Sequence, residues 1–114
     1  MRVTSALFVS ALVRRAMVGG AFAAVTRRGA SEAGAIFVVV DRLDGGFDLY
    51  GQAPQSAFLD SDRPTDRLFT RIESGVARER ILTRLGSEER FDPDLYVVEI
   101  EDKQARPFLN VVEA

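Results

Sequence analysis

Two segments of this sequence are apolar on both faces of the strand that each would form, and this pattern limits the folds open to the chain. Residues 35–41 read Ala-Ile-Phe-Val-Val-Val-Asp, and residues 95–100 read Leu-Tyr-Val-Val-Glu-Ile. Both are rich in β-branched and aromatic residues, which favour strands. Because a strand with one face in water alternates apolar with polar residues, these two strands need cover on both faces of their sheet.

Two amphipathic helices are predicted from apolar residues that recur with helical spacing. The first begins at a cap on Thr4 or Ser5 and ends at Gly19-Gly20. Its apolar stripe consists of Val9, Leu12, Val13, Ala16, Met17 and Gly20. The second begins after a cap at Ser74-Gly75, and Gly86 weakens it or ends it. Its stripe consists of Ala77, Ile81, Leu82 and Leu85.

Further strands are predicted from alternation and from turn signals. They are residues 21–28, 47–50 and 67–73, with a short final strand at 108–112. Asp44-Gly45 predicts a hairpin turn, and residues 52–64 are predicted to form a loop. The order is α-β-β-β-β-α-β(-β). It predicts one α+β domain over residues 1–114, with two helices and a largely antiparallel sheet of four to six strands.

The cover of the sheet also bears on oligomeric state. If the two helices cover one face, the other face needs a different cover. Residues 52–66, the C-terminal tail or a second subunit would supply it. A homodimer is therefore one hypothesis, and a sedimentation mass of one protomer would contradict it.

The composition excludes several classes of chemistry. The 114 residues contain no His and no Cys, which excludes a Ser-His-Asp triad, a thiolate nucleophile, a disulfide and a His or Cys metal site. Lys103 is the only lysine among 15 basic residues, and it lies in no phosphate-loop motif. We therefore assign no catalytic residue and no cofactor, and favour a protein that is not an enzyme.

The N-terminal segment raises the question of export. Residues 6–13 are apolar, but Arg14-Arg15 interrupts the run, which is too short to span a bilayer. The alternative is a twin-arginine export signal, with this doublet ahead of the apolar residues 16–25. The helical periodicity favours a folded helix, so we expect a cytoplasmic protein with no membrane segment.

The richest acidic segment contains Glu99 and Glu101. On a strand their side chains project from one face, about 7 Å apart. Such a pair suits a divalent cation, or a division of acid and base roles. The structural alternative is an ion pair with a cross-strand arginine, Arg71 or Arg27, and we favour this alternative because such pairs are ordinary stabilisers of sheets.

The doublets Arg14-Arg15 and Arg27-Arg28 are the candidate site for a phosphate group or a nucleic acid. Tyr50 and Tyr96 are the aromatic residues expected at the surface, where they could stack on bases, because their hydroxyls need water or a partner. However, adjacent residues diverge on a helix and on a strand, and the formal net charge is -2. We therefore do not expect nucleic acid as the partner.

Several stretches resemble one protein family. They are residues 9–15, 20–23, 27–29, 33–35, 49–51 and, most specifically, Arg-Phe-Asp-Pro-Asp-Leu-Tyr-Val-Val-Glu-Ile-Glu-Asp at 90–102. Together they resemble a small alphaproteobacterial family catalogued as a domain of unknown function, DUF1491. The resemblance runs over nearly the whole chain and implies a single-domain bacterial protein. It implies no activity, substrate or catalytic residue.

These observations favour a small cytoplasmic binding or interaction module that self-associates and does not catalyse a reaction. Two alternatives stay open. One is a nucleic-acid or phosphate-ligand binder that acts through the arginine doublets. The other is a metal-dependent enzyme built on the carboxylates of Glu99 and Glu101.

Overall fold

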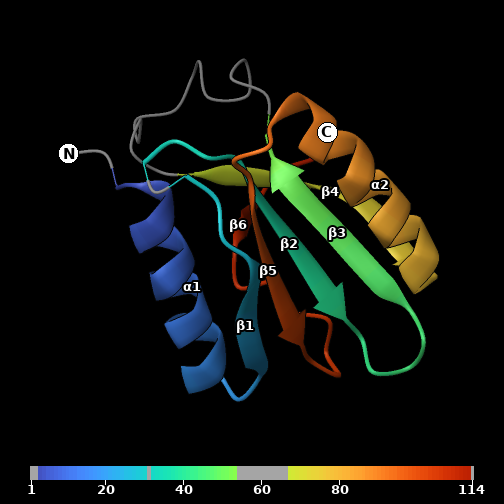
Figure 1. The fold of residues 1–114 in the computed structure, drawn as a ribbon. Helices are drawn as coiled ribbons and strands as arrows, with labels where there is room; N and C mark the ends of the chain where they lie inside the picture. Colours follow the sequence, from blue (N-terminus) through green and yellow to red (C-terminus); the bar gives the residue numbers. More distant parts are fainter. Residues whose placement is uncertain (1–2, 31, 54–66, 114) are drawn as a thin grey trace.

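The computed structural model describes residues 3–30, 32–53 and 67–113, and in them it has two helices and one six-stranded sheet (Figure 1). The helices are α1 (Ser5–Val18) and α2 (Arg78–Phe91). The strands are β1 (Phe22–Arg27), β2 (Ile36–Asp41), β3 (Phe47–Gln52), β4 (Leu68–Val76), β5 (Tyr96–Glu101) and β6 (Asn110–Val111). The α+β class and the order of elements are confirmed.

The sheet has the strand order β1-β5-β2-β3-β4-β6 and is mixed. The pairs β1–β5, β2–β3 and β3–β4 are antiparallel, whereas β2–β5 and β4–β6 are parallel. The central parallel pair consists of the two strands that are apolar on both faces. This agrees with the general burial of parallel strands on both sides.

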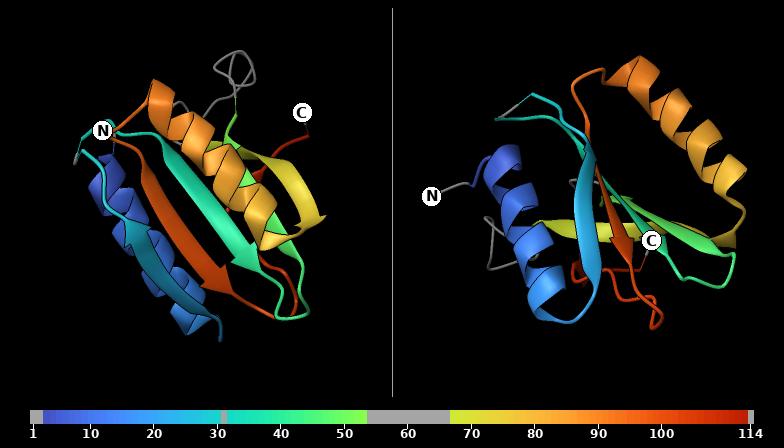
Figure 2. Two further views of the ribbon diagram at one scale, coloured as in Figure 1. Left: turned by 45° about the vertical axis from the view of Figure 1, so that its right-hand side comes forward. Right: turned by 60° about the horizontal axis from the view of Figure 1, so that its bottom comes forward.

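The two helices lie on opposite faces of this sheet (Figure 2). Buried Val9 and Leu12 of α1 pack with Val38 and Val98 on one face, and buried Ile81 and Leu85 of α2 pack with apolar residues of the other. The expectation that both helices cover one face is therefore wrong. The physical reason is that α2 forms the crossover between β4 and β5, which run in the same direction, whereas α1 precedes the sheet in the chain.

The C-terminal segment adds cover to the face that carries α1. Ala105, Phe108 and Leu109 pack against the cluster of buried residues there. Phe8 of α1 stacks on Phe69 of β4, with 5.7 Å between the ring centroids. One chain thus supplies helical cover to both faces, so the two-faced strands by themselves do not require a second subunit.

Local signals mark the ends of some elements correctly and others wrongly. Thr4 caps α1, since its hydroxyl accepts a hydrogen bond of 3.2 Å from the Leu7 N–H. Ser74-Gly75 does not cap α2. These residues lie within β4, beside a register shift against β3, and the helix begins after Ala77 without a side-chain cap. Gly86 does not end α2, and the final strand is shorter than predicted.

Residues 54–64 of the predicted loop lie outside the described residues. Within the described part of the chain, neither helix is long and apolar enough to cross a membrane.

Candidate functional site

The face of the sheet that carries α2 is only partly covered. The helix packs chiefly against β3 and β4, and the left view of Figure 2 shows β5 and β1 extending beyond it. A groove of about 380 Å³ lies between α2 and this open side. Its lining consists of Thr26, Arg27, Val39, Phe47, Arg78, Ile81, Leu82, Leu85, Glu89, Val97 and Glu99. We call it the α2 groove. Its volume is within the range of ligand pockets, roughly 300–1,000 Å³.

The interior of the α2 groove is apolar. Val39, Phe47 and Val97 come from three strands and are at most 9% exposed. Leu82 projects from α2 at the opening and is 56% exposed, although it is a large apolar residue. The groove therefore offers one exposed apolar contact above a buried apolar surface, which is the composition that receives an apolar side chain.

Two ion pairs join the helix to the strands across the groove. Arg27 contacts Glu89 at 3.1 Å, and it donates a further hydrogen bond of 2.7 Å to the carbonyl of Pro93. Arg78 contacts Glu99 at 3.5 Å. The charges of these four side chains cancel in pairs. The Arg27 Nε is buried, and no partner for it is present in the described part of the chain.

Three carboxylates meet where β2 and β5 finish, and of these Glu99 lines the groove while Asp41 and Glu101 lie just beyond its lining. Asp41, Glu99 and Glu101 each place one oxygen within 4.8 Å of the other two. The parallel register pairs Asp41 with Glu101 and Val39 with Glu99. Because Val40 and its neighbours on β5 point toward α1, the three acids point to the α2 side. We call this group the acidic cluster.

The acidic cluster carries more negative charge than its neighbours balance. Glu99 has Arg78 as its partner, and the Leu43 N–H donates a hydrogen bond of 2.8 Å to Asp41. Over residues 3–30, 32–53 and 67–113, no cationic side chain pairs with Asp41 or Glu101. Carboxylate oxygens are the ligands that Mg²⁺ and Ca²⁺ prefer, so these are the residues that could hold a divalent cation.

The ion-pair partners expected for this segment are wrong. Glu99 pairs with Arg78 of α2 and with neither Arg71 nor Arg27. The sequence patterns above do not identify Asp41, the third acid of the cluster. The sequence does contain one signal for this neighbour, because Asp41 and Glu101 each end a strand that is apolar on both faces. Recognising it required the knowledge that the two strands are parallel neighbours.

The family of the chain follows from its sequence match. The model of the family described as "Protein of unknown function (DUF1491)" matches residues 3–110. The chain belongs to the DUF1491 family. No curated protein matches this sequence.

Solved structures from alphaproteobacteria resemble this DUF1491 protein. The solution structure of protein Atu0922 from A. tumefaciens is 46% identical, with a TM-score of 0.86 over 100% of this chain and 98% of that one. A crystal structure of a DUF1491 family protein from Caulobacter crescentus CB15 is 36% identical, with a TM-score of 0.78, and covers 98% and 99% of the two chains. An NMR structure of a DUF1491 family protein from the same organism is 35% identical, with a TM-score of 0.79 over 98% of each chain.

The arginine doublets of the DUF1491 protein do not form one site. Arg15 donates two hydrogen bonds, of 3.1 and 2.8 Å, to the Phe108 carbonyl. Arg27 belongs to the α2 groove as described above. Arg14 and Arg28 are exposed, and no hydrogen bond or ion pair joins them to the described residues. The first doublet lies near the start of β1 and the second at its end.

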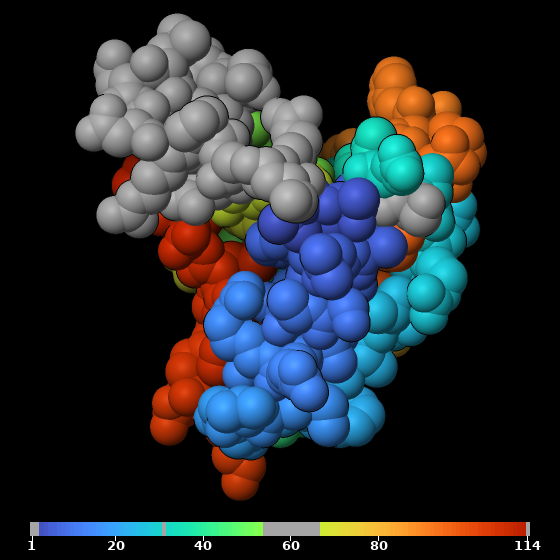
Figure 3. Space-filling view, turned by 90° about the vertical axis from the view of Figure 1, so that its left-hand side faces the viewer, coloured from blue at the N-terminus to red at the C-terminus, as the bar shows by residue number. Residues whose placement is uncertain are grey.

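Arg14 instead lies on the outer surface of α1, which faces the viewer in Figure 3. It borders a shallow depression together with Leu7 and Val18, which are 60% and 84% exposed. This surface is mixed apolar and basic. It is separate from the α2 groove, because the sheet lies between the two helices.

The expectation that Tyr50 and Tyr96 lie at the surface is wrong. They are 4% and 2% exposed, in the core on the face that carries α1. Neither ring is available to stack on a base. Burial raises the pKa of the Tyr50 hydroxyl above its ordinary value, the charge of nearby Asp48 raises this pKa as well, and the positive charge of Arg71 opposes the shift.

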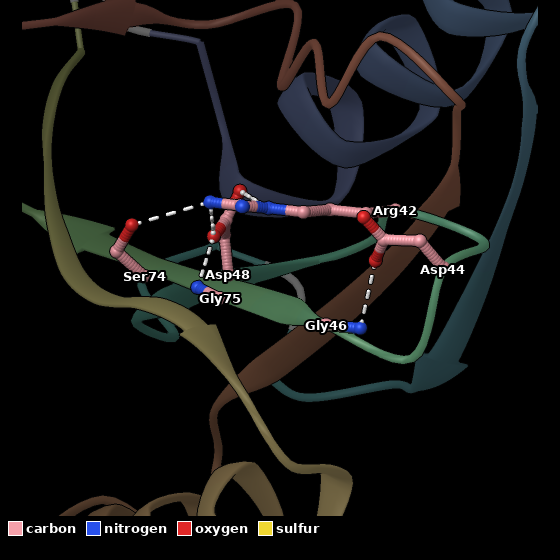
Figure 4. Close-up of polar contacts among 6 residues, drawn as sticks. All are labelled: Arg42, Asp44, Gly46, Asp48, Ser74 and Gly75. Carbon is pink, nitrogen blue, oxygen red and sulfur yellow. Dashed lines mark hydrogen bonds and ion pairs between the residues drawn. The ribbon is translucent and has the colours of Figure 1, made fainter.

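An ion pair between Arg42 and a buried acid, Asp48, joins the hairpin to the neighbouring strand (Figure 4). Asp48 is fully buried, and its two oxygens accept hydrogen bonds of 2.6 and 3.1 Å from Arg42. The Gly75 N–H donates a further bond of 2.8 Å to Asp48, and Arg42 contacts the Ser74 hydroxyl at 3.2 Å. The sequence signal for this structural pair was an acid at an otherwise apolar position of a strand.

Proposed function

We propose that this DUF1491 protein is a small, non-catalytic binding module that takes a segment of a partner protein into the α2 groove. The observation that carries the proposal is the incomplete cover of the sheet by α2. A helix is about 10 Å wide and strands are about 4.8 Å apart, so one helix covers about two strands. The β1–β5 side therefore has room for a second segment beside α2.

The composition of the α2 groove supports recognition more than catalysis. Among the residues that the structure describes, Thr26 supplies the only hydroxyl of the lining, and it donates to the Val97 carbonyl at 3.3 Å. The sequence has no His and no Cys to activate it or replace it. The surface instead combines an apolar interior with a charged rim, as protein interfaces do.

The position of α1 supports a cytoplasmic setting for this binding. The segment that carries Arg14-Arg15 also contributes Val9, Leu12 and Ala16 to the core. Removing it as a cleaved export signal would expose that core. We therefore favour its role as an integral helix of the fold over the twin-arginine interpretation.

The arginine-based and metal-enzyme alternatives receive less support. The first arginine doublet lies in α1 and the second at the end of β1, and both expected stacking residues, Tyr50 and Tyr96, are buried. The acidic cluster has ligand chemistry for a cation. In the described part of the chain, however, no hydroxyl other than that of Thr26 lines the groove beside it.

A selection experiment tests the proposed function. A displayed library of random peptides would be selected on the immobilised protein, and bound peptides would then be measured against two variants. Leu82→Glu places a charge at the groove opening, whereas Phe91→Glu changes a residue of the same helix that is 88% exposed and absent from the groove lining. We expect Leu82→Glu to weaken binding at least tenfold and Phe91→Glu to leave it unchanged.

Two outcomes would decide against this proposal. Failure to select any peptide above background would remove it, and so would equal binding to the wild type and to Leu82→Glu. Sedimentation of the wild type at micromolar concentration tests the remaining occupant, a second copy of the chain. If the wild type is a dimer and Leu82→Glu dissociates it, the groove binds a second copy of the chain and not a partner protein.

A further inference from the structure

We propose that the segment bound in the α2 groove is basic, and that it places a lysine or arginine beside the acidic cluster and an apolar residue over the groove interior. This inference rests on the proposed function, because it names the chemistry of the same ligand. It is carried by the distribution of charge along the groove and by one exposed aromatic residue beside the acids.

The unpaired charge lies beyond one end of the groove, next to the lining residues Val39 and Glu99. The pairs Arg27–Glu89 and Arg78–Glu99 cancel, and they leave Asp41 and Glu101 without a cation among the described residues. Both acids are half-buried. A cationic side chain would relieve the repulsion between their carboxylates, and an acidic ligand would increase it.

Phe22 adds a second contact suited to a cation. It is the antiparallel partner of Glu101 and lies on the same face, because the neighbouring Ala23 points into the core under α1. Its side chain is 55% exposed.

Three other phenylalanines of this chain have an arginine over the ring, and Phe22 has none among the described residues. An arginine lies over the rings of Phe8 and Phe47 at 5.4 Å and of Phe108 at 4.9 Å. No cation lies over Phe22 among the residues that the structure describes. A ligand ammonium or guanidinium group beside Glu101 could therefore contact a carboxylate and an aromatic face together.

The distance along β5 between Val97 and Glu101 determines how far apart the apolar and the basic residue of the bound segment should be. Val97 lies in the groove interior and Glu101 at the acidic end, on the same face of the strand. Four strand residues span about 13 Å, and a lysine or arginine side chain covers part of that distance. An apolar residue and a basic residue two to four positions apart in the bound segment would reach both ends.

The experiment compares charge preference rather than binding alone. The peptide selection would be repeated on the double variant Asp41→Asn/Glu101→Gln and on a control, Glu32→Gln/Glu113→Gln, which removes the same charge from two exposed acids elsewhere. We expect wild type and control to select peptides enriched in lysine or arginine near an apolar residue. Exchange of that basic residue for glutamate should weaken binding at least tenfold, and the double variant should lose this discrimination.

Peptides that depend on Leu82 but show no preference for basic residues would overturn the inference and leave the proposed function standing. Equal discrimination by the double variant would also overturn it. Failure to select any peptide would remove the proposed function itself. A titration with Ca²⁺ or Mg²⁺ tests the remaining alternative, in which a metal ion binds to the acidic cluster. Micromolar binding at the acidic cluster that excludes the peptide would assign the acids to a metal ion and overturn the inference.

Discussion

Asp41 and Glu101 are register partners in the parallel pair β2–β5, and their carboxylates meet on the face that carries α2. Glu99 completes the cluster, and it alone has an arginine partner among the described residues. Like charges on adjacent strands destabilise a sheet. The fold thus retains an unfavourable local arrangement, which is a common property of binding sites because their residues are arranged for a ligand.

The first prediction follows from this repulsion. Glu101→Gln should stabilise the free protein by about 0.5 kcal/mol, since removing one of two opposed charges relieves an interaction of about 0.2–1 kcal/mol. The midpoint of urea unfolding, followed by circular dichroism, measures the change. Because salt screens partly exposed charges, the gain should shrink in 1 M NaCl.

Glu113→Gln is the matched control, since it removes an exposed acid that forms no ion pair with the described residues. Its unfolding midpoint should stay at the wild-type value. A lower midpoint for Glu101→Gln would mean that this carboxylate makes a favourable contact in the free protein. It would also remove the argument that the unbalanced negative charge of the acidic cluster favours a cationic ligand.

The acidic cluster also shows how far sequence patterns reach. Local signals place α1, the hairpin and both two-faced strands, because periodicity, caps and turn residues act over a few positions. The parallel pairing of β2 with β5 joins segments that β3, β4 and α2 separate in the chain. No local pattern encodes that pairing. Glu99 and Glu101 could therefore be chosen as candidates, whereas Asp41 as their neighbour could not.

The errors have equally specific causes. The polarity of the hydroxyl predicts that Tyr50 and Tyr96 lie at the surface, but their positions on β3 and β5 direct them into the core under α1. Ser74-Gly75 has the composition of a helix cap. In the fold, the Gly75 N–H is held by the buried Asp48, with a φ of 63° at Gly75, and β4 continues through the pair. A distant contact overrode the local signal at each position.

The second prediction concerns that buried acid. Asp48→Ala should lower the free energy of unfolding by about 2 kcal/mol, because leaving a buried N–H without its acceptor costs roughly 1–3 kcal/mol. The Gly75 N–H and the Arg42 guanidinium both lose their partner. Asp44→Ala removes a nearby exposed acid that accepts one bond of 2.9 Å from the Gly46 N–H, and it should cost less. Chemical denaturation of both variants provides the comparison, and equal losses would contradict a special role for Asp48.

The third prediction is a pH dependence in acid. Asp102 is 7% exposed and accepts hydrogen bonds of 2.8 and 3.0 Å from the Arg106 side chain and 2.9 Å from its backbone N–H. The Arg106 side chain holds the pKa of Asp102 below its ordinary value of 3.8, against the opposing effect of burial. The stability from this carboxylate is therefore present above that value and is lost as the pH falls through the lowered pKa.

Asp102→Asn should reduce the melting temperature near neutral pH and should flatten its decline in acid. Melting curves between about pH 6 and pH 2 measure both effects. Glu113→Gln again serves as the control, with the wild-type acid profile expected. If Asp102→Asn and the wild type lost stability in parallel below pH 4, other carboxylates would have to account for the decline.

The last prediction concerns Tyr50 in alkali. Burial raises the pKa of its hydroxyl above the ordinary value of 10.0. The sequence has two tyrosines, so Tyr96→Phe leaves Tyr50 as the only group that gives a tyrosinate absorbance. In the folded variant the titration midpoint should lie above 10.0, and in concentrated urea it should return toward that value. The same midpoint in both conditions would contradict the effect of burial.

The stability of the protein should follow the same titration. With a raised folded-state pKa, the contribution of Tyr50 is fully present below the unfolded value and is lost as the pH rises through the folded value. Tyr50→Phe cannot ionise, so its stability should fall less steeply than that of the wild type above pH 10. Because this ring lies under α1, on the face opposite the α2 groove, Tyr50→Phe should leave peptide binding at neutral pH unchanged. Loss of binding in this variant would show that the core under α1 and the groove are coupled.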